Sequence, residues 1–377
     1  MILGSLGALA LILGSCCDGK TIRLRKRNGS NQGVIGLYEG TGAYYYGEME
    51  MGTPDQHLLA LFDLTSPDLF VIPEPRSNKP CFYNSSASIT YTPTDRNETI
   101  VFEDTPYGVN YATGPVAKDI LKVAGFKSVA QEFVLATTLV GLGVRPPCSF
   151  FGLGVPSFGP TSMRGPLMTL LMNGRLESSR FGLWIKTDSE EESFPEGELT
   201  LGFLNSNRYM GPLLQMPLFV TNQQWNVALT GFYIGSHSMG WSGAVRFQMR
   251  YNYNAMPKAA AAVLAGYLGA TEILINHDGL RTTWVIPCAS VPQLPTIAIG
   301  LAGFNLDLTP AQYVSPIEND PQNRCILEFM GEDDTMINSD LPTWTLGEPF
   351  FRAYYTAYDF VQNRVYVAPA VQETPTI

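Results

Sequence analysis

Hydrophobic and polar positions alternate over short segments through much of the chain. Residues 44–51 alternate in the way that predicts a half-exposed strand, and Gly52-Thr53-Pro54 predicts the turn that ends it. Residues 57–62 are mostly apolar and predict a buried strand that delivers Asp63 to a loop. Short patterned segments between turn residues are typical of a mostly β protein.

Two segments carry helical spacing. Residues 167–172 place apolar residues at helical intervals and stop at Asn173-Gly174. Residues 257–268 predict the clearest helix, with proline in the first turn followed by a run of alanines. We therefore expect a mostly β fold with few short helices.

Composition sets the scale of the molecule and narrows its partners. The 377 residues are 45% hydrophobic and 15% charged, enough for a sizeable core and for two domains or two lobes. The net charge of −10 argues against a nucleic-acid partner, because phosphate binding needs a basic surface. The acidity otherwise fits a solvated surface.

The N-terminal region predicts a secreted, extracellular protein. Residues 1–14 are almost wholly apolar, so residues 1–17 are predicted to be a signal peptide. No later stretch is long and apolar enough to span a bilayer, so we expect no membrane association once the signal is removed. Residues 18–43 contain a basic run at 23–27 and are predicted to be either a short arm or the remnant of a pro-segment.

Glycosylation and cysteine signals agree with secretion. Three tripeptides are N-glycosylation acceptors, at Asn28, Asn84 and Asn97. Four cysteines remain after the signal peptide, an even number that suits disulfides: Cys81, Cys148, Cys288 and Cys325. Their spacing does not fit a metal site, and we expect neither metal nor cofactor.

The chain also carries a weak internal repeat. Phe62-Asp63 is followed by Phe-Phe-Gly at residues 150–152, and Phe247-Gln248 is followed by Thr-Leu-Gly at residues 345–347. The two separations are similar, so we expect two lobes built on one design.

Four segments, in order, resemble the pepsin-like aspartic proteases, peptidase family A1. They are YYYGEMEMGTPDQHLLALFDLTSPDLFVIP, FFGLGVPS, CASVPQLPTIAIGLAGFNLDLTPAQYV and TLGEPFFRAYYTAYDFVQNRVYVAP. The match looks nearest to secreted invertebrate members, nematode ones among them. The resemblance implies a bilobal fold of two β-barrel-like lobes around a cleft, with an N-terminal lobe at 44–208 and a C-terminal lobe at 209–377.

The same resemblance identifies the catalytic positions. Each lobe of the family supplies one aspartate, and the pair activates a water molecule against a peptide carbonyl. Asp63 matches the first aspartate, whereas anchoring the second motif on Pro257 places the other on Gln248, an amide that does not titrate. Gln248 could donate a hydrogen bond to Asp63, and Arg250 could pair with it.

Further departures surround these two positions. The family threonines that bond across the lobes are replaced by Leu64 and Met249, which could instead pack together. The glycines that follow are replaced by Thr65 and Arg250. In the same first-lobe loop, Ser66 matches the family serine.

The flap and the disulfides complete the expectations from the resemblance. Tyr111 matches the flap tyrosine, and Phe70 replaces the tryptophan that bonds to it. At the extended spacing of strands, the segment from Tyr111 to Val123 is about four residues shorter than the family's usual flap hairpin, so the resemblance does not extend to the length of the flap. Cys288 and Cys325 match a second-lobe disulfide, and Cys81 and Cys148 would then form a first-lobe bridge.

The sequence therefore predicts a secreted, monomeric pepsin-like protein that has lost catalysis. Such a protein would bind a peptide or protein ligand, or act as a decoy, through the cleft between the lobes. The alternative is a working aspartic endopeptidase active at acid pH. It is disfavoured because no aspartate lies between Asp188 and His277 to replace Gln248.

Overall fold

The computed structural model describes most of the chain. The described residues are 25–26, 33–39, 45–73, 82–105, 108–140, 149–156, 161–187, 197–219, 224–276, 280–317, 320–332 and 343–372. Several expectations lie outside them: the signal peptide at 1–17, the acceptor Asn28, and Cys81 with Cys148.

Strands dominate the described residues and form three sheets, as the alternating pattern predicted. The first sheet holds β1 Arg25–Lys26, β2 Gly33–Glu39, β3 Tyr45–Met51, β4 Gln56–Asp63, β5 Leu69–Val71, β6 Thr92–Thr105, β7 Gly108–Val123, β8 Phe126–Leu135, β9 Thr138–Val140, β10 Ser149–Gly152, β11 Arg180–Ile185, β12 Gly197–Leu201, β13 Leu214–Pro217, β26 Tyr354–Asp359 and β27 Arg364–Pro369. The second holds β14 Asn226–Ile234, β15 His237–Ser238, β16 Gly243–Phe247, β17 Asn254–Pro257, β20 Ile297–Leu301, β21 Phe304–Leu308, β24 Phe329–Glu332 and β25 Thr343–Leu346. The third holds β18 Thr271–Asn276, β19 Leu280–Pro287, β22 Val314–Pro316 and β23 Arg324–Leu327.

Helices are short and few among the described residues. They are α1 Pro166–Met172, α2 Lys258–Leu268, α3 Pro310–Tyr313 and α4 Glu348–Ala353. Both helices expected from the sequence are present. Pro257 differs from the prediction, since it ends β17 in an extended conformation and lies just before the first turn of α2. None of the helices in the described ranges is long and apolar enough to cross a membrane.

The two strands expected near the start are also confirmed. β3 alternates between buried and half-buried residues, as its polar and apolar alternation predicted. β4 is buried over its last four residues, because it lies between two neighbouring strands, β3 and β10. It ends at Asp63, which is thereby fixed at the point where the chain leaves the sheet.

The internal repeat corresponds to a repeated strand arrangement. In the first lobe β10 runs parallel to β4 and antiparallel to β5, and β5 runs parallel to β8. In the second lobe β25 runs parallel to β16 and antiparallel to β17, and β17 runs parallel to β24. The two lobes therefore present equivalent loops, one after Asp63 and one after Phe247.

Two glycines show how closely these loops match. A Cβ on Gly152 would lie 2.2 Å from the carbonyl oxygen of Ser66, and one on Gly347 would lie 2.5 Å from that of Tyr251. Ser66 is three residues after Asp63, and Tyr251 is three residues after Gln248. The same close approach recurs at the same offset, which supports the equivalence of Asp63 and Gln248.

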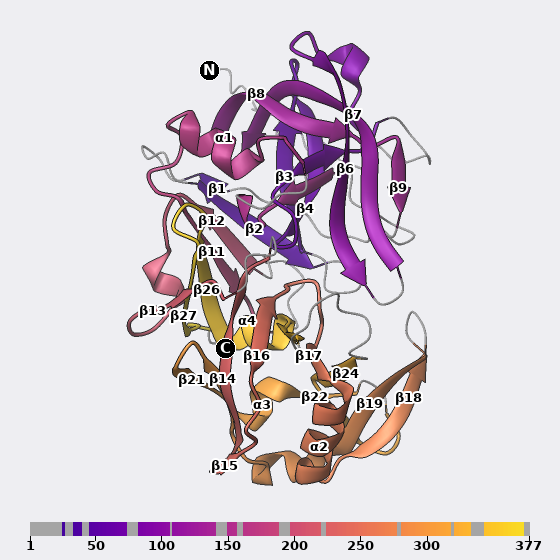
Figure 1. Cartoon of the computed structure of the whole chain (residues 1–377), viewed down its shortest axis with the longest axis vertical. Coiled ribbons are helices and arrows are strands. Elements are labelled where there is room, and N and C mark those ends of the chain that lie inside the picture. Colours follow the sequence, from indigo (N-terminus) through magenta and orange to yellow (C-terminus); the bar gives the residue numbers. More distant parts are fainter. Residues whose placement is uncertain are drawn as a thin grey trace, which may run out of the picture.

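The lobes are joined by a shared sheet rather than by a simple linker. The C-terminal strands β26 and β27 belong to the first sheet, where β26 pairs with β11, and β12 in turn pairs with β2 (Figure 1). The C-terminal end of the chain therefore returns to the N-terminal lobe. Residues 33–39, expected to lie in the basic arm, supply β2 to this sheet.

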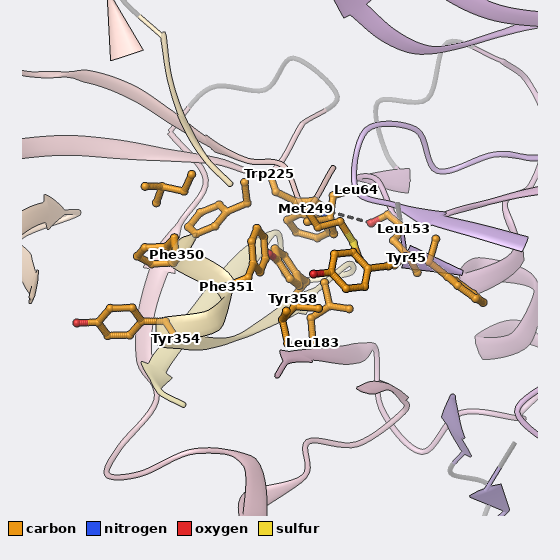
Figure 2. Packing of buried hydrophobic residues seen from close by; sticks show 14 of the residues in the cluster. Tyr45, Leu64, Leu153, Leu183, Trp225, Met249, Phe350, Phe351, Tyr354 and Tyr358 are labelled. Atoms are coloured by element: carbon orange, nitrogen blue, oxygen red, sulfur yellow. Dashed lines mark hydrogen bonds between the residues drawn. The ribbon is translucent and has the colours of Figure 1, made fainter. Parts of the chain in front are cut away.

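One buried cluster extends across both lobes. It includes Leu64 and Phe62 from the first lobe and Met249 and Phe247 from the second. Trp225 is fully buried in the same cluster, and its indole N–H donates to the carbonyl of Leu153 at 2.8 Å (Figure 2). Burial of so much apolar surface at the junction holds the two loops at a fixed separation.

The second-lobe disulfide is confirmed. Cys288 and Cys325 are bonded, and they join the end of β19 to β23 in the four-stranded sheet. In a chain-entropy estimate, closing a loop of 37 residues stabilises the fold by about 3–4 kcal/mol.

The loop glycines give the first prediction. Gly347→Ala would place its Cβ 2.0 Å from the carbonyl oxygen of Tyr253, and we expect it to lower the free energy of unfolding by about 1–3 kcal/mol or more. Gly266→Ala, in α2, is the matched control. Its Cβ meets nothing within 4 Å, so it should raise stability by about 0.5–1 kcal/mol. Urea denaturation compares them, and equal effects would show that the loop is not tightly packed.

Candidate functional site

Asp63 is the last residue of β4, at the start of the first-lobe loop. Its main-chain carbonyl accepts from the N–H of Leu153 at 2.7 Å, and the N–H of Gly154 donates to Ser66 at 3.0 Å. These bonds fix the loop against the segment that follows β10. The side chain of Asp63 is fully buried, so its charge requires partners within the protein.

Gln248 occupies the equivalent place in the second lobe. Its N–H donates to the carbonyl of Leu346 at 2.9 Å, and its carbonyl accepts from Tyr251 at 3.2 Å. The side chain is buried, and its amide oxygen has no hydrogen-bond partner within the described residues. An amide at this place supplies no titratable proton.

Arg250 forms an ion pair with Asp63. The Nε atom of Arg250 lies 2.5 Å from Oδ2 of Asp63, and the two side chains are 2% and 0% exposed. The pairing considered from the sequence is therefore confirmed. A guanidinium stays protonated at any ordinary pH, so this contact holds a cation against the carboxylate permanently.

The other carboxylate oxygen is engaged by Thr65. The N–H of Thr65 donates to Oδ1 of Asp63 at 2.7 Å, and its hydroxyl contacts the same oxygen. That hydroxyl also contacts the carbonyl of Phe102, so one proton is shared between two acceptors. Both oxygens of Asp63 are thus occupied by groups of this chain.

Phe102 was not anticipated from the sequence. It is buried on β6, with its ring centroid 5.5 Å from Phe70 and 5.4 Å from Phe150. Phe70 and Phe150 are themselves stacked at 5.1 Å. The aromatic ring in place of the family tryptophan is therefore held by an apolar stack and needs no hydrogen-bond partner.

A sequence signal could have found Phe102. Residues 100–102 form a short apolar run, Ile-Val-Phe, in which Ile100 and Phe102 are buried and Val101 is exposed. Pro106 and Gly108 form a turn signal just beyond. Reading these together would have placed the hairpin before Tyr111.

The position of Tyr111 departs from the expectation. The hairpin is made by β6 and β7, whose pairing closes at Thr105 and Gly108, and Tyr111 lies within β7 opposite Val101 and Val140. The segment from Tyr111 to Val123 is therefore the second strand of the hairpin and not a shortened flap. The Tyr-Ala-Thr-Gly motif therefore follows the turn of the hairpin along the chain.

Leu64 and Met249 pack into the hydrophobic core, as expected of apolar residues that replace two threonines. Both are buried in the same cluster, which also contains Trp225 (Figure 2). Replacing both polar partners together avoids leaving a buried hydroxyl without a partner. Contact between the lobes at this point is hydrophobic.

A second buried acid lies in the first-lobe loop. Asp68 accepts from the hydroxyl of Thr161 at 2.9 Å, and its N–H donates to the hydroxyl of Ser66 at 3.3 Å. Burial raises the pKa of Asp68 to about 6, although the Thr161 hydroxyl opposes the change and the nearby Glu98 adds to it.

The predicted glycosylation positions that are described face solvent. Asn84 and Asn97 are both exposed. The side-chain oxygen of Asn84 accepts from Ser86 at 3.0 Å, which leaves its amide nitrogen outside that contact. Within the described ranges, no group of three or more metal-ligating side chains is present.

Comparison with known proteins agrees with this geometry. A profile of the family described as eukaryotic aspartyl protease matches residues 44–370. The chain belongs to this family. It is 29% identical to cathepsin D of Dictyostelium discoideum over 342 residues, covering 88% of this chain and 84% of that protein. It is 29% identical to gastricsin of Mus musculus, covering 87% and 81%, and 27% identical to pepsin A of Sus scrofa, covering 86% and 81%.

Family membership shows how unusual the floor of this site is. A eukaryotic aspartyl protease works with two carboxylates that share a proton. In this member the described loops bring together one carboxylate, one amide and one guanidinium. The arrangement can hold a charge, but it offers no acid and base of matched strength.

The buried pair gives a second prediction. Arg250→Met or Asp63→Asn alone leaves one uncompensated buried charge and should cost about 3–5 kcal/mol of stability. The double variant should cost clearly less than the sum. Urea unfolding of all four proteins measures the coupling, and additive costs within about 0.5 kcal/mol would show that the pair does not interact. Lys122→Met, which removes a surface contact with Asp55, should leave the unfolding midpoint nearly unchanged.

Asp68, the second buried acid of the first-lobe loop, gives a third prediction. The folded pKa of Asp68 is about 6 against an ordinary value of 3.8, so the folded state binds the proton more tightly. Stability from Asp68 is therefore full at low pH and is lost as the pH rises from about 4 to 6, by at most about 3 kcal/mol. Asp68→Asn should remove this loss and be more stable than wild type at neutral pH.

Glu132 provides a control for this test, because its pKa is shifted in the opposite direction. Burial raises the pKa of Glu132, but the Arg164 N–H and the cations Arg96 and Lys118 outweigh it and leave the pKa below its ordinary value. Stability from Glu132 is thus present at neutral pH and is lost as the pH falls. Glu132→Gln should be destabilised mainly at neutral pH. Melting temperatures across the range compare both variants with wild type, and parallel curves for Asp68→Asn and wild type would contradict the assignment.

Proposed function

We propose that this chain is a secreted pepsin-like protein without peptidase activity, which binds a peptide or protein ligand, or serves as a decoy, through its interlobe cleft. One observation carries the loss of activity. The only carboxylate at the paired positions, Asp63, contacts Arg250, and the other position is held by Gln248.

The chemistry explains why this combination is inactive. Cleavage needs one group to take a proton from water while another gives a proton to the peptide. Gln248 can do neither, and Arg250 does not release its proton. Asp63 has its oxygens engaged by Thr65 and Arg250, so an attacking water has no base to activate it.

An active aspartic endopeptidase is the alternative. It would require a different second acid, and the sequence has no aspartate between Asp188 and His277. The close approaches of Gly152 and Gly347 at matching offsets support Gln248 as the true counterpart of Asp63. The alternative is therefore disfavoured.

The binding role is supported by what the molecule retains. Both loops, the shared sheet and the second-lobe disulfide are intact, whereas the second position of the catalytic pair carries Gln248. Secretion is supported by the apolar residues 1–14, by the disulfide and by exposed acceptor sites. We infer a monomer that leaves its cleft available to a ligand.

The activity test is direct. The purified secreted protein is incubated with denatured globin from acid to neutral pH, and fragments are identified by mass spectrometry, with pepsin A as positive control. We expect no fragments above the level of a blank. Cleavage that an aspartic-protease inhibitor abolishes would overturn the proposal.

Restoring a second acid provides a sharper arm of the same test. Gln248→Asp alone should remain inactive, because Arg250 still neutralises Asp63. The triple variant with Gln248→Asp, Met249→Thr and Arg250→Gly restores the family residues at these three positions of the second-lobe motif. Activity in the single variant would show that Arg250 does not block the site.

A further inference from the structure

Arg250 joins three segments that are distant in sequence. It belongs to the second-lobe loop, its Nε contacts Asp63 of the first-lobe loop, and its Nη2 donates to the carbonyl of Phe102 on β6 at 3.3 Å. Its guanidinium carbon also lies 5.9 Å from the centroid of the Phe102 ring. One side chain therefore connects both catalytic loops with the β6–β7 hairpin.

Strand β6 is held at the same point by a second donor. The hydroxyl of Thr65 contacts the carbonyl of Phe102. The same carbonyl accepts a hydrogen bond from Arg250. Beneath this carbonyl the Phe102 ring packs on Phe70 and Phe150. Polar contacts on the main chain and apolar contacts on the side chain thus fasten β6 over Asp63.

We propose that Arg250 is an internal plug of the catalytic floor, which keeps β6 closed over Asp63 and excludes ligand groups from that carboxylate. The plug selects among ligands. A peptide whose affinity depends on a hydroxyl placed against the catalytic carboxylates does not bind, whereas a peptide that contacts only outer parts of the cleft is unaffected. The inference rests on the proposed function, since it concerns the same site.

Energetics favour the plug over such a ligand. A hydroxyl that reached Asp63 would have to separate a buried ion pair and leave a guanidinium without its counter-charge. A neutral hydrogen bond contributes only about 0.5–1.5 kcal/mol, which is less than the about 3–5 kcal/mol cost of stranding a buried charge. The exchange is therefore unfavourable.

Pepstatin, a peptide with a central hydroxyl in place of a scissile amide, is the probe. Its binding to the intact protein is measured by isothermal titration calorimetry at acid pH, with pepsin A as positive control. We expect no binding to wild type, so that its affinity is at least about 1,000-fold weaker than for pepsin A, as a stranded charge implies. Tight binding to wild type would overturn the plug.

The hold on β6 is measured separately by hydroxyl-radical footprinting. Oxidation of Phe102, Phe70 and Phe150 should rise about fivefold or more in Arg250→Met, while Phe350 and Tyr354 in the second lobe stay protected. Thr65→Val, which leaves the ion pair in place, should give a smaller rise. Arg250→Met and Thr65→Val each test the hold on β6, so one variant suffices if the other folds poorly.

Arg246→Met is the matched control for a buried arginine. Arg246 donates to Thr345 at 2.6 Å and lies 3.8 Å from Glu332, both in the second lobe. Its removal should leave the oxidation of Phe102 unchanged. An unchanged footprint in folded Arg250→Met, or an equal rise in Arg246→Met, would contradict the plug.

The two proposals fail in different ways. Cleavage of globin overturns the proposed function. Pepstatin binding without any cleavage overturns only the plug, because it shows an inactive site whose carboxylate is still reachable.

Discussion

The buried contact between Asp63 and Arg250 is the constraint on which the centre of this molecule depends. A carboxylate removed from water must be compensated, and here a residue of the opposite lobe supplies the compensation. The pair therefore serves the fold, because it ties the two catalytic loops together where the family threonines would have bonded. The same contact places a permanently protonated partner beside Asp63, and such a partner does not take part in proton transfer.

The surrounding changes are consistent with that single constraint. Leu64 and Met249 replace the polar link between the lobes with apolar packing, and Phe70 replaces a donor with a stacked ring. Thr65 and Arg250 take positions where glycine would leave space, and their side chains fill it with contacts to Asp63 and Phe102. Leu64, Met249 and Phe70 carry no polar side-chain group that would need a buried partner. Thr65 and Arg250 instead add donors that contact Asp63 and Phe102, so groups of this chain close the floor of the site.

Much of the architecture could be predicted from local patterns. Strands β3 and β4 and helices α1 and α2 lie where the alternation and the turn residues placed them, because burial of alternate side chains is encoded locally. The repeat of Asp63 and Gln248 was also readable from spacing. Tyr111, which the resemblance matches to the flap tyrosine, lies on the second strand of the β6–β7 hairpin, after the turn signal at Pro106 and Gly108.

The sequence by itself determined the family, the mostly β class and the absence of any aspartate between Asp188 and His277, because motif order, periodicity and residue identity are properties of the chain. Only the tertiary structure decided what happens to the remaining acid. Asp63, Phe102 and Arg250 are far apart in sequence, and their contact depends on how two lobes and a hairpin pack around one buried charge. Long-range packing of this kind leaves no local signal. For that reason the sequence could suggest the pairing of Arg250 with Asp63 but not its joint contact with β6.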